Sequence, residues 1–511
     1  MGIPSYYKRL IDKYPTLVKR GGQSLLKSDI LYMDFNCLIY YCLKTRPPYK
    51  SEERSEWEAG LIEDVKRYTL VVWEAAGRPG SVFIGVDGVV PMAKIRQQRL
   101  RRFKSVWLAA AEREAGARVG ESWDSNAITP GTAFMEALSV GLRALGRGWV
   151  ISGAEEPGEG EQKLMAAARS ADLTGKAVAV YGLDADLIVL SLKALVEQPV
   201  KSWHLLREGG EFGVVTHPFA TLDVGLLLTT LVPRGQVAHE YVNDYICAMS
   251  FLGNDFLPHS LTVKIRDAGH DKMLVALRHV HDKGLHLVVG GQVKGEAAAE
   301  FISEWVRTEE DLLLHAIRHK YTMRPMVPRT DTERLMSGVQ NRPIEWRVEA
   351  GLVEGPVEKP TGLVSNWRSI YQRWLFDVPV EQAAAEYVRG LQWIVDYYSG
   401  KPISYSWYYP WNVPPLWSDI RAALLKGEPV APLRTLPIAP QEQLAMVLPL
   451  ESWGLVRDKG LRTLPSVAPA FWPSKFSFFS AGRRWIWECE AEIPVLCVER
   501  LRSIPSLKPL A

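Results

Sequence analysis

Residues 177–186 read Ala-Val-Ala-Val-Tyr-Gly-Leu-Asp-Ala-Asp, an apolar run that ends in two aspartates. The run lacks the alternation of a half-exposed strand, so it predicts a strand that is buried on both faces. Three earlier apolar runs have the same character, at Ile30–Met33, Ser81–Val86 and Gly148–Ser152. Strands of this kind occur in parallel sheets that helices cover on both sides. The four runs therefore predict a parallel central sheet.

The stretches between these runs complete an α/β pattern. Apolar residues recur at helical spacing in Trp57–Ala76 and in Phe134–Leu145. Strands that alternate with helices predict an α/β fold, with a mostly parallel central sheet flanked by helices.

The same pattern divides the chain into four parts. Residues 1–270 are expected to form the core, and residues 271–321 to form a helical extension. Residues 322–362 hold five prolines and many charges, which predicts a linker or draped loop. Residues 363–511 are expected to form a second, largely helical and aromatic-rich region packed onto the core, with short strands between Phe471 and Pro494.

The composition excludes several classes of protein. The chain has 511 residues, of which 47% are hydrophobic and 23% charged, as is typical of globular proteins. Its five cysteines include no Cys-x-x-Cys pair, which argues against a disulfide scaffold and a zinc knuckle. No apolar run approaches the roughly 18 residues of a membrane helix. We expect a soluble intracellular protein that does not bind membranes; the sequence identifies neither nucleus nor cytoplasm and no protein partner.

Carboxylates follow each of the predicted strands. A single acid at such a place is usually a helix cap or a turn residue. However, the carboxyl ends of parallel strands meet at one edge, where open α/β sheets bind ligands. The group expected to lie there consists of Asp34, Asp87, Glu159, Glu161, Asp184, Asp186 and Asp255.

So many carboxylates repel one another, and burying them without cations costs several kcal/mol each. A set of oxygen ligands without His or Cys favours Mg²⁺ or Mn²⁺ over zinc. Two such ions activate a water and stabilise the leaving oxygen of a phosphodiester. The acids therefore predict a two-metal site for phosphoryl chemistry, with these residues as metal ligands and catalytic groups.

A basic segment begins seven residues after Asp87. The net charge of +3 does not by itself indicate nucleic acid, but Lys94–Lys104 carries six positive charges and no acid. The segment lacks Gly and Pro, and on a helix Lys94, Gln98, Arg101 and Arg102 share one face. These side chains predict a phosphate-binding pocket, since guanidinium groups grip phosphate oxygens bidentately. The alternative is a solvated basic face.

Two aromatic positions are candidates for stacking on nucleic-acid bases. Tyr40 lies six residues after Asp34, and Trp407 lies within Tyr-Ser-Trp-Tyr-Tyr at 405–409. Stacking on aromatic rings tolerates every base. Packing in the core is the alternative, above all for Tyr408 and Tyr409.

Long stretches of the chain resemble the XRN family of 5′-to-3′ exoribonucleases. In the first half these are Met-Gly-Ile-Pro (1–4), Leu-Tyr-Met-Asp-Phe-Asn (31–36), Asp-Gly-Val-Val-Pro-Met-Ala-Lys (87–94) and onward to Phe103, Ile-Thr-Pro-Gly-Thr (128–132), Pro-Gly-Glu-Gly-Glu-Gln-Lys (157–163), Tyr-Gly-Leu-Asp-Ala-Asp (181–186) and Phe-Leu-Gly-Asn-Asp-Phe-Leu-Pro-His (251–259). In the second half they are Tyr-Val-Arg-Gly-Leu-Gln-Trp (387–393), Trp-Tyr-Tyr-Pro (407–410), Glu-Gln-Leu-Ala-Met-Val-Leu-Pro (442–449) and Phe-Trp-Pro (471–473). The order is collinear, apart from a divergent stretch near 265–365.

The resemblance implies a PIN/FEN-like nuclease core and a processive enzyme that degrades single-stranded RNA from a 5′ monophosphate to mononucleotides, in RNA decay or processing. It assigns the seven carboxylates to metal binding and the four residues of the basic face to the 5′ phosphate. It further implies that the second region narrows the opening so that only single strands enter.

Two positions depart from the family pattern. Tyr40 stands where the family commonly has His, and Tyr405 stands where the first of two Trp is expected. Both replacements keep an aromatic ring, so stacking could persist, but Tyr40 removes the proton-donating role that the His would have. Two other functions remain as alternatives: a flap-type structure-specific DNA endonuclease and a catalytically inactive RNA-binding protein.

Overall fold

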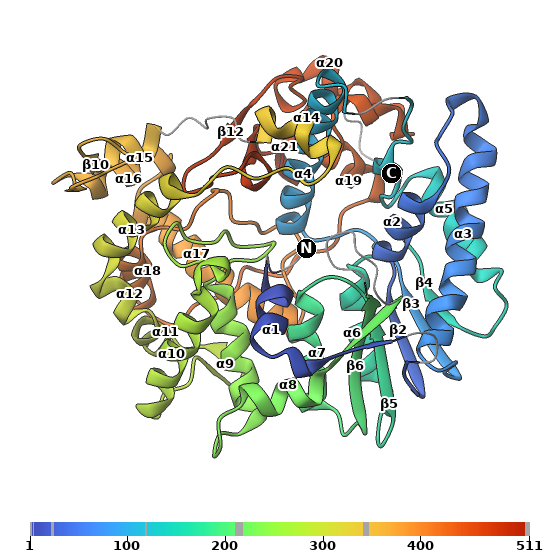
Figure 1. Ribbon diagram of the computed structural model, residues 1–511, viewed down its shortest axis with the longest axis horizontal. Helices are drawn as coiled ribbons and strands as arrows, with labels where there is room; N and C mark the ends of the chain where they lie inside the picture. The colour runs from blue at the N-terminus through green and yellow to red at the C-terminus, as the bar shows by residue number, and fades with distance from the viewer. Residues whose placement is uncertain are drawn as a thin grey trace.

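The four predicted apolar strands lie side by side in a seven-stranded sheet, from its middle to one edge. The structure is a computed structural model that describes residues 3, 5–21, 25–117, 120–209, 218–340 and 347–505. The strand order is β1-β7-β6-β5-β2-β3-β4 (Figure 1). Neighbours from β4 to β6 pair in parallel, whereas β7 pairs antiparallel with β6 and β1. The strands are β1 (Val18–Gly21), β2 (Ile30–Asp34), β3 (Ser81–Gly85), β4 (Val150–Ser152), β5 (Ala177–Tyr181), β6 (Ser202–Glu208) and β7 (Phe219–Asp223).

The sequence predicts β2 to β5 to within two residues at each end, and this confirms the mostly parallel α/β core. It misses β1, β6 and β7, which lie together on one side of the sheet. In β6, Ser202, His204 and Arg207 interrupt the apolar pattern and remain partly exposed. The residues of β6 therefore lack the uninterrupted apolar run that is typical of a strand buried on both faces.

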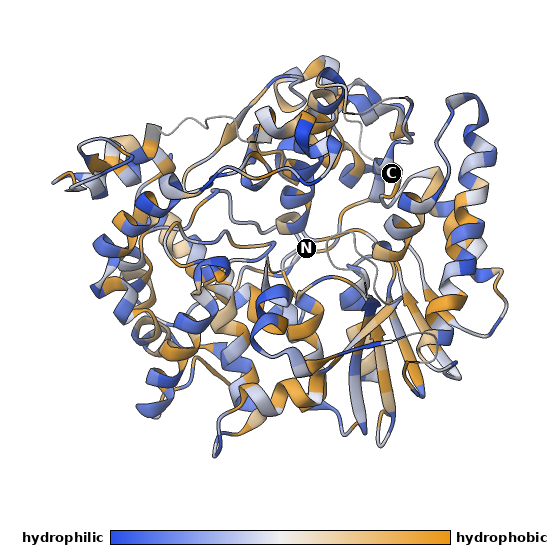
Figure 2. Cartoon of the chain, viewed as in Figure 1, coloured by the Kyte–Doolittle hydropathy of each residue, from blue (hydrophilic) through white to orange (hydrophobic). Residues whose placement is uncertain are grey.

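Helices cover both faces of the sheet, because alternate strand residues point to opposite sides. Leu31 and Met33 pack under α2, α3 and α5, whereas Tyr32 packs on the other face, under α6 and α7. Figure 2 shows hydrophobic residues along the strands and hydrophilic residues on the outer faces of the helices. The helices of this part are α1 (Tyr6–Lys13), α2 (Asn36–Thr45), α3 (Arg54–Ala75), α4 (Met92–Glu114), α5 (Ala133–Arg143), α6 (Gly160–Ser170), α7 (Asp186–Glu197), α8 (Val224–Leu231) and α9 (Ala238–Ser250).

The strand order reverses between β2 and β5. From β2 the chain adds β3 and β4 outward on one side, and it then returns to place β5 and β6 on the other. At such a reversal the loops after neighbouring strands diverge and leave a crevice at the carboxyl ends, where α/β proteins bind ligands. Three of the predicted acids lie at or just after the carboxyl ends of β2 and β5, and three more follow β3 and β4.

The rest of the chain is largely helical, with three short hairpins. The helices are α10 (Gly269–Asp282), α11 (Gly295–Phe301), α12 (Ser303–Arg307), α13 (Glu309–Thr322), α14 (Asp331–Gln340), α15 (Arg347–Leu352), α16 (Trp367–Leu375), α17 (Val380–Tyr398), α18 (Trp417–Leu424), α19 (Pro440–Val447), α20 (Leu464–Val467) and α21 (Val498–Ser503). The hairpins pair β8 (Val288–Val289) with β9 (Gln292–Val293), β10 (Val353–Glu354) with β11 (Gly362–Leu363), and β12 (Ser477–Phe479) with β13 (Glu490–Glu492).

Helix α4 joins the two regions. It stands between the sheet and the C-terminal segments in Figure 1. Arg96 Nη2 lies 2.9 Å from the carbonyl oxygen of Pro410, and Arg99 Nη1 lies 2.7 Å from that of Met446. The two arginines that fall off the predicted phosphate-binding face thus hold the second region against the core.

The range 322–362 is more ordered than a linker. Its described part contains α14, α15, β10 and the start of β11, and residues 341–346 lie outside the described residues. Leu352 and Val353 are buried against α13 and α16, so these short elements are held by packing that no local pattern reveals. The other domain boundaries stay predictions, and most of the matched stretch 1–4 also falls outside the described residues.

All five cysteines are free thiols, in agreement with the absence of a disulfide pattern. Of the helices that the structure describes, none has both the length and the apolar character that crossing a membrane requires.

Candidate active site

The reversal of strand order brings six of the seven predicted carboxylates to one edge of the sheet. The seventh, Asp255, arrives from the loop after α9. Each of the six follows a parallel strand: Asp34 at the end of β2, Asp87 two residues after β3, Glu159 and Glu161 at the start of α6 after β4, and Asp184 and Asp186 at the start of α7 after β5.

The amino-terminal end of α6 lies directly against two of these strands. A methyl group on Gly160 would lie 2.6 Å from Oδ1 of Asp34, 2.6 Å from the carbonyl oxygen of Gly85 and 3.4 Å from Oδ1 of Asp87. Only glycine permits this approach. The backbone N–H of Gly160 donates to Asp87 Oδ1 at 2.7 Å. The positive end of the helix dipole therefore faces the carboxylates and stabilises them.

Asn36 fixes the other side of the Asp87 carboxylate. Its Nδ2 donates to Asp87 Oδ2 at 2.8 Å, and its Oδ1 accepts the backbone N–H of Asp87 at 3.2 Å. This reciprocal pair links the loop after β2 to the loop after β3. Asn36 belongs to a matched stretch of the sequence, but it was not among the predicted site residues because a single Asn two residues after an acid carries no distinctive pattern.

Lys94 extends from α4 into the carboxylate cluster. Its Nζ lies 2.6 Å from Oε2 of Glu159 and 2.7 Å from Oδ2 of Asp255. Burial alone disfavours the ammonium form, but the charges of Asp255 and Glu159 outweigh it and raise the pKa of Lys94. Lys94 was predicted to bind phosphate, and here it neutralises two of the seven acids.

The environment of the acids shifts their proton affinity strongly. Burial, followed by the charges of Asp87, Asp184 and Asp186, raises the pKa of Asp34 well above its ordinary value. Burial, assisted by Asp184, raises the pKa of Asp186 to about 7. Perturbation of this kind is typical of functional sites, because it persists only where the fold forces charges together.

The chemistry of the acids fits divalent cations. Within the described structure, Oε1 of Glu161 and Oδ1 of Asp186 are buried and have no hydrogen-bond partner. A buried carboxylate oxygen without a partner is costly, and a cation removes the cost. The seven acids are spaced more widely than the direct ligands of one ion. The one group of three ligand atoms within 4.8 Å of each other in the described residues lies elsewhere.

The four residues of the predicted phosphate-binding face all lie on α4, next to the acids. Lys94, Gln98 and Arg102 are buried, whereas Arg101 is half-buried and lines a cavity of about 390 Å³ together with Asp255. In the described structure, Gln98 Oε1 and Arg102 Nη1 are buried and lack hydrogen-bond partners. Burial lowers the pKa of Arg102 to about 10. A desolvated guanidinium with a free donor is a favourable site for an anion.

The two predicted stacking residues lie in different environments. Tyr40 lies on α2 and is 37% exposed. Trp407 is buried; its ring lies 5.3 Å from that of Trp393, and its indole N–H donates to Glu386 at 3.1 Å. Its surroundings are those of a core residue. Stacking stays a prediction for both.

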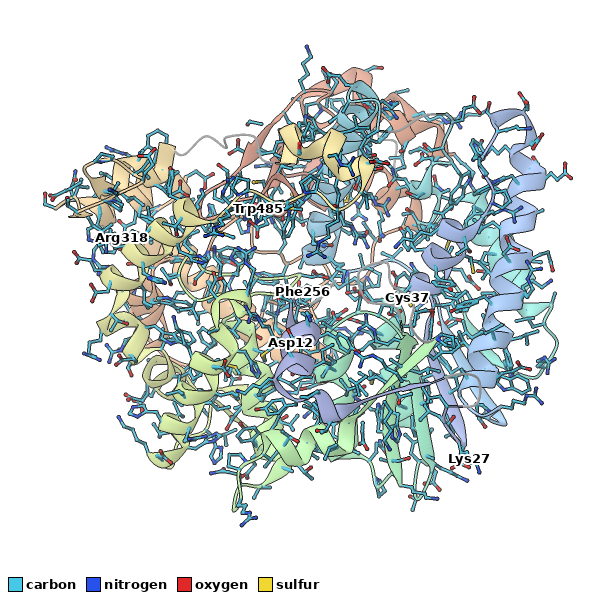
Figure 3. All side chains as sticks on the ribbon, viewed as in Figure 1. Asp12, Lys27, Cys37, Phe256, Arg318 and Trp485 are labelled. Carbon is cyan, nitrogen blue, oxygen red and sulfur yellow. The ribbon has the colours of Figure 1, made fainter. Side chains whose placement is uncertain are left out.

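Tyr397 of α17 is a site residue that the sequence did not reveal. Its hydroxyl donates a hydrogen bond to Oε1 of Glu159. Figure 3 shows Phe256, the residue after Asp255, near the centre of the molecule, and Cys37, three residues after Asp34, on the side of the sheet. The rings of Phe256 and Tyr397 meet edge to face, 4.9 Å apart. The second region therefore supplies one wall of the site.

Comparison with known proteins agrees with this architecture. The family model described as the XRN 5′-3′ exonuclease N-terminus matches residues 1–209, and the one described as the Xrn1 helical domain matches residues 238–342 and 376–508. Human 5′-3′ exoribonuclease 1 is 27% identical over 98% of this chain and 34% of its own length. The 5′-3′ exoribonuclease 2 of Cryptococcus neoformans is 28% identical over 61% of this chain and 36% of its own length, and that of Kluyveromyces lactis is 28% identical over 72% and 46%.

The chain thus spans a third to somewhat under half of the length of these relatives. The two family models leave residues 210–237, 343–375 and 509–511 unmatched, and the second of these segments overlaps the range 322–362 that the sequence predicts as a linker. The seven acids, Tyr397 and every strand of the central sheet except β7 lie inside the matched residues; β7 falls between the two family models. The chain belongs to the XRN family of 5′-3′ exonucleases.

Proposed function

We propose that this chain is a processive 5′-to-3′ exoribonuclease that hydrolyses 5′-monophosphorylated single-stranded RNA to mononucleotides with two Mg²⁺ or Mn²⁺ ions. One observation carries the proposal: buried carboxylates with unpartnered oxygens lie beside a helix whose buried cations face the same space. The names of the relatives, which are 5′-3′ exoribonucleases, support the direction and the substrate class.

The metal ligands in this proposal are the seven predicted carboxylates. Glu161 and Asp186 are the strongest candidates, since each has an oxygen without a partner in the described structure. Bound ions of this kind activate a water and stabilise the leaving oxygen of the phosphodiester. Asn36 and the backbone N–H of Gly160 hold Asp87 in one orientation, and Tyr397 and Lys94 hold Glu159. Four groups of the chain therefore hold the carboxylates of Asp87 and Glu159 in fixed orientations.

The basic face of α4 receives the 5′ end. Arg101 lines the cavity, and Gln98 and Arg102 on the same helix are buried, each with a polar atom that has no partner in the described structure. A terminal monophosphate satisfies these groups. The family resemblance implies that such a pocket excludes a cap or a triphosphate, and we propose the same here. When the 5′ phosphate is bound there, the first phosphodiester bond lies at the carboxylates. Each round of hydrolysis then releases one nucleotide.

The test is incubation of the protein with RNA that carries a 5′ monophosphate, triphosphate or hydroxyl, and with flap DNA, each with Mg²⁺ or EDTA. We expect mononucleotides from monophosphate RNA with Mg²⁺, and none with EDTA. Excess unlabelled RNA added after the start should not stop degradation of molecules already engaged. Cleavage at a flap junction would indicate the DNA endonuclease, and binding without products would indicate an inactive RNA-binding protein.

Asp184→Ala is the matched variant. It should abolish turnover and leave RNA binding measurable, because RNA affinity comes mainly from the basic side chains. The control is Asp172→Ala, at an exposed aspartate after α6 whose side chain accepts the N–H of Thr174 two residues further along the chain. If Asp184→Ala retains the wild-type rate, the assignment of the acids to catalysis is wrong.

A further inference from the structure

Two histidines and one aspartate from separate elements converge outside the carboxylate site. Asp244 lies in the middle of α9, His281 lies at the end of α10, and His286 precedes β8. Nε2 of His281 and Nδ1 of His286 each lie 2.8 Å from Oδ2 of Asp244. These three atoms lie within 4.8 Å of one another, the only such group in the described parts of the chain.

The Asp244 carboxylate is completely buried, and its side chain is 0% exposed. Within the described residues, its ion-pair contacts are the two imidazoles and no Lys or Arg. A buried carboxylate requires a compensating positive charge, and in other buried acids of this chain a lysine supplies it. At Asp244 the compensation must come from the imidazoles or from a cation between them.

Neighbouring groups contact two of the three side chains, Asp244 and His286, on the sides that face away from the cluster. The backbone N–H of Val288 donates to Oδ1 of Asp244 at 2.8 Å, which leaves Oδ2 directed at the imidazoles. The second ring nitrogen of His286, Nε2, lies 4.0 Å from Oε2 of Glu240. A histidine that binds metal through one nitrogen commonly presents its other N–H to a carboxylate, which fixes the tautomer. Glu240 is placed to do this for His286.

We propose that Asp244, His281 and His286 bind one Zn²⁺ ion through Oδ2, Nε2 and Nδ1, with water as a fourth ligand. Two imidazoles and one carboxylate are a common zinc ligand set. Tetrahedral zinc with ligands at about 2.0–2.1 Å needs donor atoms about 3.3 Å apart, so each imidazole retreats from Asp244 by about 0.5 Å on binding. His281 is almost fully buried, but the His286 side chain is 30% exposed and gives the ion access from solvent.

The role that follows from the position is structural. The ion joins α9, the last helix of the core, to α10 and to the β8–β9 hairpin. The hairpin in turn is bound to Gln392 of α17, whose Oε1 accepts the N–H of Val293 at 2.8 Å and whose Nε2 donates to the carbonyl of Gly291 at 3.0 Å. Helix α17 also carries Tyr397. Zinc here would stiffen the support of the wall that faces the acids, at a distance from the chemistry.

The test is metal content and Zn²⁺ titration of the full chain in millimolar Mg²⁺, which occupies the acids but does not compete for imidazole. Co²⁺ serves as a spectroscopic probe, because a tetrahedral site with nitrogen ligands gives a visible absorption band. The variants are His281→Gln and His286→Gln, which keep a donor to Asp244 but remove the imidazole. His279→Gln is the control, at an exposed histidine of α10 that pairs with Glu300.

The expected result is one Zn²⁺ per chain, a Co²⁺ band, and a Tm that rises with Zn²⁺ in the wild type and in His279→Gln. Each of the other two variants should lose at least about tenfold in zinc affinity and the zinc-dependent rise in Tm. The proposal is overturned if the wild type binds no zinc in the presence of Mg²⁺, since the three side chains then form a hydrogen-bonded cluster only. It is equally overturned if both variants bind zinc as tightly as the wild type.

Discussion

The hydroxyl of Tyr397 donates a hydrogen bond to the Glu159 carboxylate, although 238 residues separate them. Glu159 belongs to the sheet region and Tyr397 to the helical region, so the contact joins the two family-matched parts of the chain inside the candidate site. The Tyr397 ring stacks on Trp393 at 5.1 Å with an interplanar angle of 10°. This packing fixes the hydroxyl, and through it the carboxylate. A cut between the two regions would therefore remove the hydroxyl that holds the Glu159 carboxylate.

The first prediction is that Tyr397→Phe lowers turnover more than stability. The change removes one hydrogen bond to a charged acceptor, worth about 1.5–3 kcal/mol, which corresponds to at least about a tenfold effect on rate if it is used to orient Glu159. The Mg²⁺ concentration for half-maximal rate should rise, because a less oriented carboxylate binds the ion more weakly. Single-turnover rates as a function of Mg²⁺ provide the measurement.

The control for this variant is Tyr387→Phe, on the same helix. The Tyr387 hydroxyl is buried and has no hydrogen-bond partner in the described structure, so its removal costs nothing at the acids. Equal rates and equal Mg²⁺ dependence for both variants would show that the contact with Glu159 does not orient a ligand.

The second prediction concerns pH in the absence of metal. The pKa of Asp186 is raised from 3.8 to about 7, first by burial and then by Asp184. Between these values the folded protein holds more protons than the unfolded chain, so the free energy of unfolding falls as pH rises. In EDTA the Tm should therefore decline from about pH 5 to about pH 8, and Mg²⁺ should cancel much of the decline because the ion replaces the proton.

Tryptophan fluorescence during thermal unfolding measures this effect. Asp186→Asn is the matched variant, because it keeps the shape of the side chain and cannot ionise. Its Tm in EDTA should depend less on pH, and the difference from wild type isolates the contribution of Asp186. A wild-type Tm that increases over the same pH range without metal would contradict the arrangement of charges described above.

The third prediction concerns the end of the RNA. Arg101→Ala removes the cavity-lining side chain that we propose binds the 5′ phosphate, so the preference for 5′-monophosphate over 5′-hydroxyl RNA should fall by about tenfold or more. The effect should lie mainly in KM. Arg113→Ala is the control, since Arg113 lies on the same helix but is exposed. An unchanged preference in Arg101→Ala would dismiss the pocket.

The fold could be predicted from the sequence where the burial of a strand produces a continuous run of apolar residues. Strands β2 and β5 are apolar without alternation because helices cover both of their faces, and the acids that follow them mark the carboxyl edge. In β6, polar residues such as His204 interrupt such a run. The segments around Leu352 and Val353 acquire their order from α13 and α16, which a local pattern cannot show.

The site could be predicted only in part for a similar reason. The acids stand in short motifs next to strands, and the basic face of α4 follows from helical spacing. Tyr397 and Asn36 act through partners that are distant in the sequence or lie in another loop, and neither has a pattern of its own. The sequence also could not show that Lys94 pairs with Glu159 and Asp255, because its position on the basic face is equally compatible with a phosphate ligand.

The fourth prediction tests the order of the segment once expected to be a linker. Lys320 of α13 and Glu349 of α15 form an ion pair of 2.6 Å, with side chains only 4% and 2% exposed. Glu349 also accepts the N–H of Gly482, and Lys320 donates to the carbonyl of Ser480 at 2.9 Å. The pair therefore fixes α15 to the C-terminal hairpin region. Lys320→Met should destabilise the protein by about 3–5 kcal/mol, because it leaves a buried carboxylate without a counter-charge.

Lys320→Met combined with Glu349→Leu should recover most of this loss, since two apolar side chains replace a desolvated pair. Arg307→Ala serves as the control: Arg307 pairs with Glu304 on the surface, and its loss should produce no measurable change. Urea unfolding monitored by tryptophan fluorescence measures all four proteins. If the single Lys320 variant were as stable as the wild type, α15 would not be anchored as the ion pair indicates, and the segment would behave as the loose connection that its five prolines first indicated. If instead the single variant is unstable and the double variant recovers the free energy of unfolding, a tertiary ion pair holds this segment in place. A contact of that kind produces no pattern in the local sequence, so the sequence could not predict it.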